Sequence, residues 1–358
     1  MKNKRVLVAM SGGVDSSVAA AILKEEGYEV VGATMKIWPK ELCGREKEKA
    51  CCSLKDVEDA RKVCKNLGIR HYVLNLESDF RKNVIDYFTK EYLAGRTPNP
   101  CIVCNEKVKF GTLLKKAQAL DCDFIATGHY ARIERNRGYR LREAVDKTKD
   151  QSYVLFSLSQ KQIKKILLPV GSLTKDSVRA KAKQIGLHVS EKPDSQEICF
   201  VPDNDYSEFI KKYCRLESKK GEVLDSSGTL LGYHQGFWNF TIGQRRGLGI
   251  AARNPLYVIE IRAKDNVIVA GEANDAKKKR FLVKGMNWLI EAIKKETEFE
   301  VKIRYNHKKS QASIKDIGGN KLEVDFKEPQ NAITPGQAAV FYDGEYVAGG
   351  GWIDQILG

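Results

Sequence analysis

The chain has 358 residues, of which 42% are hydrophobic and 30% charged, and it carries a formal net charge of +15. This length suggests two or three domains, and no run approaches the roughly 18 apolar residues of a membrane-spanning helix. The N-terminal sequence MKNKRVLVAM is too short before the first predicted strand to be a signal peptide, so we expect a cytoplasmic protein. We expect its nine cysteines to be free, metal-binding or catalytic, not to form a disulfide framework.

Strand and helix patterns alternate through the first part of the chain. The predicted strands are RVLVAM (5–10), YEVVGATM (28–35), HYVLNL (71–76) and DFIATG (123–128). The predicted helices cover about 15–26, closed by Gly27, about 53–68, closed by Gly68, and then about 79–93 and 107–120. This alternation predicts an α/β fold with a doubly wound parallel sheet and helices on both faces.

The predicted secondary structure changes after about residue 210, where helices are replaced by short β-rich runs separated by glycine turns. The lysine run AKKKR (276–280) suggests a linker between two β-rich parts. We therefore expect a catalytic domain over 1–210, a small central domain over 211–280 and a C-terminal β-barrel-like domain over 281–358. Residues 281–358 carry a net charge of −1, so the first 280 carry +16, and a nucleic acid would meet mainly that part.

The segment SGGVDSS (11–17) joins the first predicted strand to the first predicted helix. A glycine-rich turn in this place presents backbone N–H groups to an anion such as a nucleotide phosphate, and Asp15 is a candidate to hold Mg²⁺ directly or through water. The familiar triphosphate loop needs a lysine, which this turn lacks. SGGVDSS instead resembles the loop of the ATP pyrophosphatase superfamily, whose members activate a substrate oxygen by adenylation and release pyrophosphate.

Longer motifs identify a branch of that superfamily. GRTPNPCIVCNEKVKFGTLL (95–114), PDSQEICFVPDNDYSEFI (193–210) and GYHQGFWNFTIGQRRGLGI (232–250), with ATGHYARI and KDQSYVLFSLSQ, resemble the bacterial and organellar tRNA-specific 2-thiouridylases. The resemblance covers essentially the whole chain. It implies an enzyme that replaces the 2-oxygen of the wobble uridine with sulfur, using ATP, a tRNA and a sulfur donor, which is either a persulfide carrier protein or sulfide.

The resemblance implies that two cysteines carry out the sulfur transfer. Cys199 receives sulfane sulfur as a persulfide, and Cys104 either attacks C2 of the uracil or ends in a disulfide when product forms. Some members carry aspartate where this chain has Cys101. Cys101, Cys104 and Cys199 would also supply the three thiolates of a [4Fe–4S] cluster with an open iron, which could deliver sulfide. A Cys101–Cys104 disulfide is a third interpretation. Free thiols on a loop are expected for Cys43, Cys51 and Cys52.

The remaining site residues also follow from the resemblance. The nucleotide is expected to contact Ala9, Met10, Ser11, Gly12, Gly13, Val14, Asp15, Ser16, Met35 and Gly128. The tRNA is expected to contact Asn99, Pro100 and Cys101 at the target base, and also Lys149, Asp150, Gln151, Arg304 and Tyr305. From the residues themselves, Arg245 and Arg246 among glycines suit contact with RNA phosphates. His129 could orient phosphate, act as an acid or serve a structural role.

Two functions from other classes compete with thiolation. A ligase of the same superfamily that amidates a small carboxylate would use ammonia and would need no paired cysteines. A non-catalytic RNA-binding protein would not need an intact SGGVDSS loop. Sulfur incorporation distinguishes the first, and tRNA-stimulated pyrophosphate release distinguishes the second. The sequence carries no signal for an oligomeric state.

Overall fold

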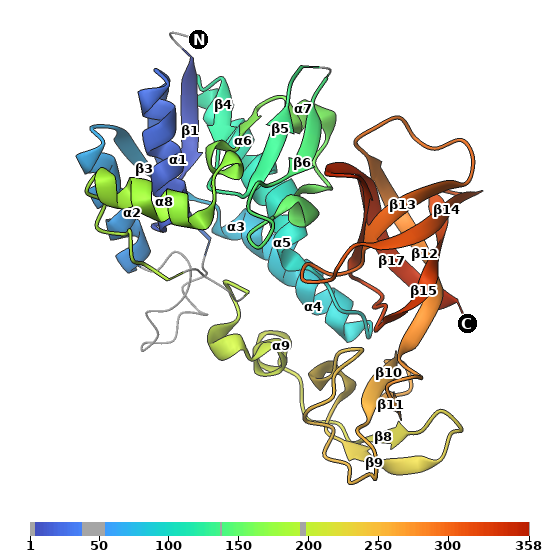
Figure 1. Ribbon diagram of the computed structural model, residues 1–358. Coiled ribbons are helices and arrows are strands. Elements are labelled where there is room, and N and C mark those ends of the chain that lie inside the picture. The colour runs from blue at the N-terminus through green and yellow to red at the C-terminus, as the bar shows by residue number, and fades with distance from the viewer. Residues whose placement is uncertain (1–3, 38–53, 137, 194–197, 358) are drawn as a thin grey trace. The chain divides into compact units, whose positions relative to one another are not determined.

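The computed structural model describes residues 4–37, 54–136, 138–193 and 198–357, so Cys43, Cys51 and Cys52 lie outside the described residues. The chain forms two compact units (Figure 1). Unit 1 comprises Met1–Ile85, Cys101–Pro202 and Glu345–Val347. Unit 2 comprises Asp86–Pro100, Asp203–Gly344 and Ala348–Gly358. None of the helices in the described residues is long and apolar enough to cross a membrane.

Unit 1 contains a five-stranded parallel sheet, which confirms the predicted α/β class. The strand order is β3-β2-β1-β4-β7, formed by β1 (Arg5–Ala9), β2 (Glu29–Lys36), β3 (Arg70–Asn75), β4 (Phe124–Ala126) and β7 (Ile166–Leu167). The central strand β1 buries three successive apolar residues, Val6, Leu7 and Val8. Such a continuous apolar run is typical of a parallel strand covered on both faces.

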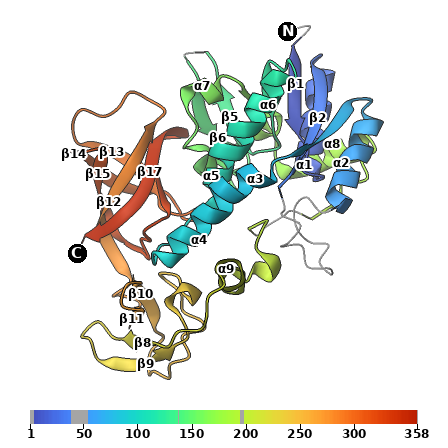
Figure 2. The same ribbon diagram turned by 180° about the vertical axis from the view of Figure 1, so that it is seen from behind.

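Helices cover both faces of this sheet. α1 (Val14–Glu25), α2 (Leu54–Asn66) and α8 (Lys175–Gln184) share one apolar cluster with Val6 and Val8 of β1. On the other face α6 (Leu113–Ala119) contacts β4, and Figure 2 shows α6 together with α3 (Glu77–Phe80) on that side. Gly27, which follows the C-cap residue Glu26 of α1, has a φ of +86°, in agreement with the predicted stop there.

Two predicted helices begin earlier than expected and contain π-helical turns. The helix predicted over 79–93 consists of α3, the π segment η2 (Arg81–Ile85) and α4 (Asp86–Leu93). The helix predicted from about 107 begins with α5 (Pro100–Val103) and continues through the π segment η3 (Cys104–Thr112) into α6. Proline at the first helical position is pre-organised for a helix. Cys101 and Cys104 therefore lie within the helix, not before it.

The rest of unit 1 surrounds the sheet with short elements. β5 (Ala131–Glu134) and β6 (Arg140–Glu143) form an antiparallel hairpin, and Tyr346 pairs with Arg142 of β6. The short helices are η4 (Ser152–Leu155), α7 (Gln160–Ile163) and η5 (Pro169–Ser172), while η6 (Pro202–Asn204) lies where the chain passes from unit 1 to unit 2.

The described residues of unit 2 include the α-helices α4 and α9, a small four-stranded sheet and a barrel. Tyr92 of α4 stacks on Tyr206 of α9 (Tyr206–Cys214) with ring centroids 4.9 Å apart. The sheet has the order β10-β11-β8-β9. Its strands are β8 (Gly221–Leu224), β9 (Leu230–His234), β10 (Tyr257–Arg262) and β11 (Val267–Gly271), with the short helix η7 (Phe237–Asn239) between the two pairs. Fewer helices after residue 210 were expected, and the described chain agrees.

The C-terminal part of unit 2 is a closed antiparallel barrel. Its strands are β12 (Lys277–Trp288), β13 (Thr297–Lys302), β14 (Ser310–Gly318), β15 (Lys321–Asn331), β16 (Ala338–Asp343) and β17 (Tyr346–Leu357). The barrel closes because β12 pairs with both β15 and β17, which leaves no open sheet edge at β12. The predicted linker at AKKKR is wrong: 277–280 begin β12, and Arg280 pairs with Asp325 in the ladder. Exposed lysines can extend from a strand into water while the backbone is paired.

Candidate active site

The strand order of unit 1 places a ligand-binding edge at the end of β1. β1 lies between β2 and β4, so successive crossovers leave it on opposite sides, and ligands bind outside the carboxyl ends of the strands at such a switch point. The turns after β1 and β4 meet there, because a Cβ on Gly128 would come within 2.6 Å of the backbone nitrogen of Ser16. The structure thus brings Gly128 against the predicted phosphate loop.

Glycine is required at the second position of the loop. Gly12 has a φ of +73°, and a Cβ there would lie 2.4 Å from the backbone oxygen of Asp56 in α2. The Nζ of Lys192 donates to the carbonyl of Gly12 at 2.9 Å and also contacts carboxylate oxygens of Asp56 and Asp59, each at 2.7 Å. Lys192 therefore ties the loop to the first turns of α2.

The same lysine and Asp59 shift each other's pKa. Burial opposes ionisation of Asp59, but hydrogen bonds from Lys192 and His188 leave the pKa of this carboxyl below its ordinary value. Burial likewise opposes the charge on Lys192, yet its bonds to Asp56 and Asp59 raise the pKa of the ammonium. The Asp59 carboxylate and the Lys192 ammonium therefore stay ionised at neutral pH and form an ion pair behind the loop.

The N-terminus of α1 is open toward the loop. Gly13 is the N-cap residue and makes no side-chain cap to the helix. Ser16 and Ser17 instead donate to the carbonyl of Gly13, at 3.1 and 2.8 Å, and the hydroxyls of Ser11 and Ser16 lie 3.2 Å apart. The first N–H groups of a helix have no intrahelical acceptor and attract anions. This local geometry suits a phosphate group.

Asp15, in the first turn of α1, is engaged by two residues from distant parts of the chain. The Nζ of Lys175 donates to its two carboxylate oxygens at 2.7 and 2.8 Å. The hydroxyl of Tyr130 donates to Oδ1 at 2.7 Å. The sequence analysis did not select Lys175, Tyr130 or Lys192. The one signal for Lys175 was a lysine directly after a threonine N-cap, where a helix dipole disfavours a cation.

Two further predicted or considered residues lie at the same edge. Met35 is near the carboxyl end of β2, and the neighbouring Thr34 donates its hydroxyl to the carbonyl of Met10 at 2.9 Å. His129, just after Gly128, is buried, and its Nδ1 lies 2.7 Å from the hydroxyl of Thr127. Burial holds the pKa of His129 well below its ordinary value, so a neutral imidazole with a structural hydrogen bond is favoured over an acid.

The paired cysteines differ sharply in environment. Cys101 is exposed within α5, whereas Cys104 is buried at the start of η3. Burial raises the pKa of the Cys104 thiol to about 11, against the opposing charge of Lys109. A thiol with this pKa is protonated at neutral pH, so Cys104 must lose a proton before it can act as a nucleophile.

Cys199 lies in the same neighbourhood as η3 but is not part of a metal-ligand group. The ring of Phe200, the next residue, contacts Phe80 of α3 at 5.6 Å, and α3 packs against η3, which begins at Cys104. Cys199 itself is half-buried, and like Cys101 and Cys104 it forms no disulfide in the described part of the chain. Within 4–37, 54–136, 138–193 and 198–357, no three His, Cys, Asp or Glu side chains are grouped so that they could hold a metal ion.

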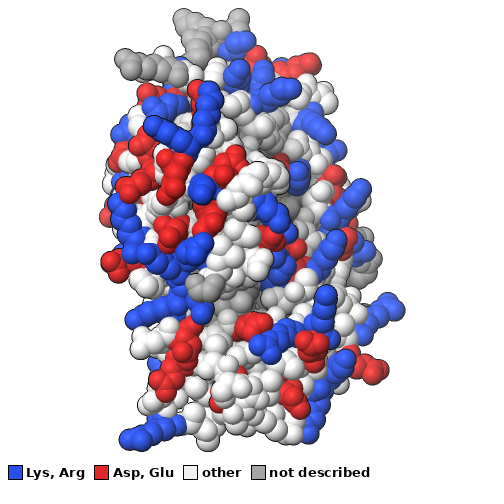
Figure 3. Space-filling model, turned by 90° about the vertical axis from the view of Figure 1, so that its right-hand side faces the viewer, with Lys and Arg blue, Asp and Glu red and all other residues white. Residues whose placement is uncertain are grey.

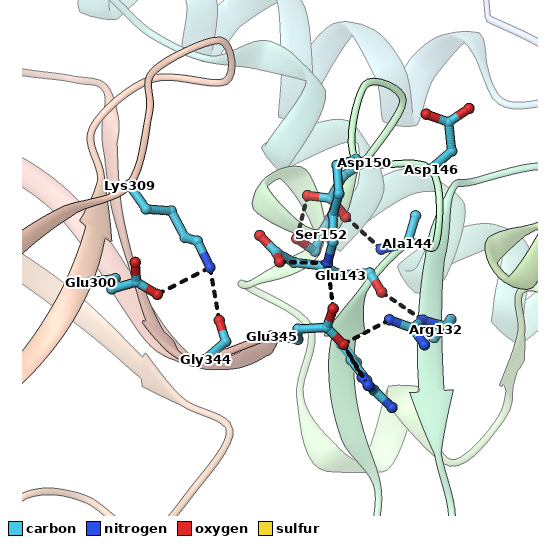
Figure 4. Close-up of polar contacts among 12 residues, drawn as sticks. Arg132, Glu143, Ala144, Asp146, Asp150, Ser152, Glu300, Lys309, Gly344 and Glu345 are labelled. Atoms are coloured by element: carbon cyan, nitrogen blue, oxygen red, sulfur yellow. Dashed lines mark hydrogen bonds and ion pairs between the residues drawn. The ribbon is translucent and has the colours of Figure 1, made fainter. Parts of the chain in front are cut away.

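The predicted tRNA-contact segment 149–151 contains one inward-facing residue. Asp150 is buried, and its carboxylate accepts from the backbone of Ala144 at 2.9 Å and from the hydroxyl of Ser152 at 2.8 Å (Figure 4). Burial raises the pKa of Asp150. Gln151 accepts from the backbone nitrogen of Tyr130 at 2.9 Å, while Lys149 is half-buried. Asp150 and Gln151 therefore shape the loop that precedes η4.

A single carboxylate offsets much of the positive charge of the β5–β6 hairpin. Glu345 accepts from Arg132 at 3.1 Å, from Arg142 at 2.7 Å and from Lys147 at 2.8 Å (Figure 4). Hydrogen bonds from Lys147 and Arg142 lower the pKa of Glu345 to about 2. The basic residues of this hairpin are thus already partly paired.

The RNA-contact residues predicted in unit 2 include the half-buried Arg304 and the exposed Arg245 and Arg246. The guanidinium of Arg304 donates to the carbonyls of Ile242 and Ala332 at 2.9 and 3.1 Å. Ile242 begins a turn whose glycines at 243, 247 and 249 all have positive φ and whose Arg245 and Arg246 are exposed. Arg304 therefore supports the base of an exposed basic turn. Figure 3 shows basic and acidic side chains intermixed on the face it displays.

The other predicted tRNA contacts lie at 99–101 and at Tyr305. Asn99 is half-buried and Pro100 is buried, and they precede the exposed Cys101. Tyr305 follows Arg304, and the Nζ of Lys302 lies 6.0 Å from the centre of its ring.

Comparison with known proteins gives three matching family segments. A family model described as "tRNA methyl transferase HUP domain" matches residues 4–203, one described as "tRNA methyl transferase PRC-barrel domain" matches 207–272, and one described as "Aminomethyltransferase beta-barrel domain" matches 278–353. The first alone covers more than half of the chain.

Relatives of similar length match the whole chain. The "tRNA-specific 2-thiouridylase MnmA" of Acetivibrio thermocellus is 50% identical over 358 residues, which is 99% of this chain and 100% of that protein. A protein of the same name from Carboxydothermus hydrogenoformans is 51% identical over 360 residues, which is 99% of this chain and 98% of that one. A solved 4-thiouridine synthetase in complex with RNA and ATP matches loosely, with 17% identity and a TM-score of 0.36 over 58% of this chain and 50% of that chain.

Proposed function

We propose, from the premise that this chain belongs to the tRNA-specific 2-thiouridylase family, that it replaces the 2-oxygen of the wobble uridine of tRNA with sulfur in an ATP-dependent reaction. The observation that carries the proposal is the glycine-rich turn at the end of β1. Its geometry leaves the N-terminus of α1 open to phosphate, and it belongs to the same unit as Cys104 and Cys199. An anion site and two thiols in one compact unit suit activation followed by sulfur transfer.

The first step is adenylation, because the oxygen of a uracil carbonyl is a poor leaving group. The 2-oxygen attacks the α-phosphorus of ATP, the bond from this phosphorus to the bridging oxygen breaks, and the electron pair leaves on pyrophosphate. The open N–H groups after Gly13 and the hydroxyl of Ser11 support this role, since they would hold the phosphates. Met35 and Gly128, at the ends of β2 and β4, would border the nucleoside.

Mg²⁺ is the metal that nucleotide phosphates ordinarily require. Asp15 lies in the first turn of α1 and is a suitable ligand by chemistry, but Lys175 and Tyr130 already donate to its carboxylate. This arrangement fits a metal held through water, or a metal that replaces Lys175 at the carboxylate. When bound, Mg²⁺ would neutralise phosphate charge.

Sulfur transfer follows through the two cysteines. Cys199 accepts a sulfane sulfur from a donor and becomes a persulfide, whose terminal sulfur attacks C2 and displaces AMP. The thiolate of Cys104 then attacks the Sγ of Cys199, the S–S bond breaks, and its electron pair stays on the sulfur attached to C2. The products are 2-thiouridine and a Cys104–Cys199 disulfide, which a cellular thiol reduces. α3 packs against η3, which begins at Cys104, and also against Phe200, the residue after Cys199. This packing supports the approach of the two cysteines.

The alternative carrier, a [4Fe–4S] cluster, needs Cys101, Cys104 and Cys199 as a three-thiolate group. The described residues include no such group, so their arrangement favours the persulfide. We expect anaerobically prepared protein without iron to thiolate tRNA when it is given a persulfide donor, and we expect Cys101→Asp to stay active. Activity that follows iron content and disappears with a chelator would support the cluster instead.

The tRNA is the proposed partner, and the exposed turn of Arg245 and Arg246 is the best-supported phosphate contact in unit 2. Contacts from Asn99, Lys149 and Tyr305 remain part of the proposal. The three matched segments support domain boundaries near 210 and 280, with a catalytic domain, a central tRNA-binding domain and a C-terminal domain. The sulfur donor is either a persulfide carrier protein or sulfide.

The proposal is tested by reconstitution with ATP, an unmodified tRNA transcript and a persulfide donor. We expect pyrophosphate release that depends on tRNA, together with thiolated tRNA detected by its retardation in a mercury-containing gel. Consumption of ammonia without sulfur incorporation would indicate an amidating ligase. Binding of tRNA without pyrophosphate release would indicate a non-catalytic RNA-binding protein.

A further inference from the structure

A buried lysine lies beside the open end of α1. Lys175 is the first residue of α8, directly after the N-cap residue Thr174, and it is 8% exposed. Its Nζ is 2.7 and 2.8 Å from the two carboxylate oxygens of Asp15. It also lies 5.8 Å from the centre of the ring of Tyr130, whose hydroxyl donates to the same carboxylate.

The position of this lysine is electrostatically unfavourable for a purely structural residue. The N-terminus of α8 presents the positive end of the helix dipole to the ammonium, and burial removes water from a group that is strongly hydrated. The neighbouring N-terminus of α1 adds a second positive dipole end, since Asp15 is in its first turn. Asp146 accepts from the backbone nitrogen of Lys175 at 3.0 Å and offsets the end of α8. Asp15 offsets both the ammonium and the end of α1, and a phosphate placed there would add further negative charge.

The phosphate loop lacks a cation of its own. SGGVDSS has no lysine or arginine, whereas loops of comparable function use a lysine that reaches the outer phosphates. Lys175 brings an ammonium to the first turn of the loop's helix from 160 residues further along the chain. Asp15 and Tyr130 fix the position of that ammonium at the end of the loop.

We propose that Lys175 is the phosphate-binding cation of this nucleotide loop, and that Asp15 and Tyr130 are the residues that position it. The inference rests on the proposed use of ATP. As the α-phosphorus bond breaks and the electron pair moves onto pyrophosphate, the Lys175 ammonium donates to the oxygens that gain charge. Because the group acts on the outer phosphates, it distinguishes ATP from AMP.

The chain provides a matched control on the same two helices. Lys181, two turns further along α8, pairs with Glu25 at the far end of α1 at 2.6 Å. This second bridge joins the same helices but lies away from the loop. If Lys175 served only to hold α8 against α1, Lys181→Ala and Lys175→Ala would act alike on nucleotide binding.

The test measures the affinities of the full-length chain for ATP and for AMP in the absence of tRNA. We expect Lys175→Ala to weaken ATP binding by about tenfold or more, the loss of one charge-assisted hydrogen bond, and to leave AMP binding within about twofold. Lys175→Arg should keep part of the preference for ATP, Tyr130→Phe should reduce it less than Lys175→Ala, and Lys181→Ala should leave both affinities unchanged.

Equal losses for ATP and AMP in Lys175→Ala, or an unchanged preference for ATP, would overturn the assignment. Lys175→Met preserves the aliphatic stem and repeats the measurement if the alanine variant fails to fold. The wild-type protein separates this inference from the proposed function. If it binds ATP over AMP but thiolates no tRNA, the proposed function fails while the Lys175 comparison still decides this inference.

Discussion

The phosphate loop of unit 1 and the basic turn of unit 2 are both glycine-rich, but the charged side chains at the loop are paired with neighbours, whereas those of the turn extend into water. In the loop region, Asp15 is paired with Lys175, and Lys192 is paired with Asp56 and Asp59. In the turn, Arg245 and Arg246 are exposed, and the half-buried Arg304 supports the backbone beneath them. A small nucleotide requires charges fixed in advance by neighbours, whereas a long polyanion is attracted by side chains that remain in water.

The largest effect that this comparison predicts is on the loop. Asp15→Ala removes the partner of Lys175 and the candidate metal ligand, so the rate of pyrophosphate release should fall by about 100-fold or more, as for loss of a transition-state contact. Binding of tRNA should stay near the wild-type value, because Asp15 belongs to no RNA-facing turn. The two quantities are measured on the same preparation. Near-normal pyrophosphate release would contradict the role given to the loop.

An intermediate effect is expected from the basic turn. The double substitution Arg245→Ala and Arg246→Ala should weaken tRNA binding roughly tenfold at moderate salt and reduce the slope of log affinity against log salt by about 1 for each lost phosphate contact. Adenylation at saturating tRNA should change little. Lys294→Ala is the control, since this exposed lysine of the barrel domain is paired with Glu291. An unchanged salt slope in the double variant would show that the turn does not contact phosphate.

The smallest effect concerns the ion pairs behind the loop. Lys192→Met should lower the free energy of unfolding by about 1 kcal/mol at pH 7, because Asp56 and Asp59 lose a hydrogen-bonded cation. The depressed pKa of Asp59 stabilises the fold above the unfolded value of about 3.9, and this contribution is lost as pH falls through the lower folded value.

The difference in free energy of unfolding between wild type and Lys192→Met should therefore shrink between pH 5 and pH 3, a range that follows from the pKa of about 3.9 for an unfolded aspartate carboxyl. Denaturant titrations at several pH values measure it. Lys183→Met serves as the control, because Lys183 and Glu191 form a pair in which both side chains are exposed. A difference that stayed constant down to pH 3 would contradict the proposed role of the Asp59 carboxylate.

The residues of the candidate nucleotide site that are consecutive in the sequence could be predicted. The residues that reach the site from distant parts of the chain could not. SGGVDSS, the strand before it and the helix after it are local patterns, so the loop and the parallel sheet were expected correctly. Tyr130, Lys175 and Lys192 approach the loop from 115 to 180 residues away, and no local pattern places any of them beside it. Only the fold brings them together.

Two errors of prediction have local causes. The helix containing Cys101 and Cys104 starts at Pro100, and the proline itself was the available signal for the first helical position. The AKKKR run was interpreted as a linker because like charges usually mark solvated chain, but the barrel leaves these side chains exposed while the backbone of β12 pairs. The first four residues of β12 are all charged, so the hydrophobic pattern does not reveal where this strand begins.

The central claim is that one protein activates tRNA at the loop and transfers sulfur through separate thiols. Its most direct test measures pyrophosphate release and tRNA thiolation in one reaction, for the wild type and for Cys199→Ala and Cys104→Ala. We predict both products from the wild type, and pyrophosphate release without thiolated tRNA from either variant. Thiolation at the wild-type rate by either variant, or no tRNA-dependent pyrophosphate release by the wild type, would contradict the account.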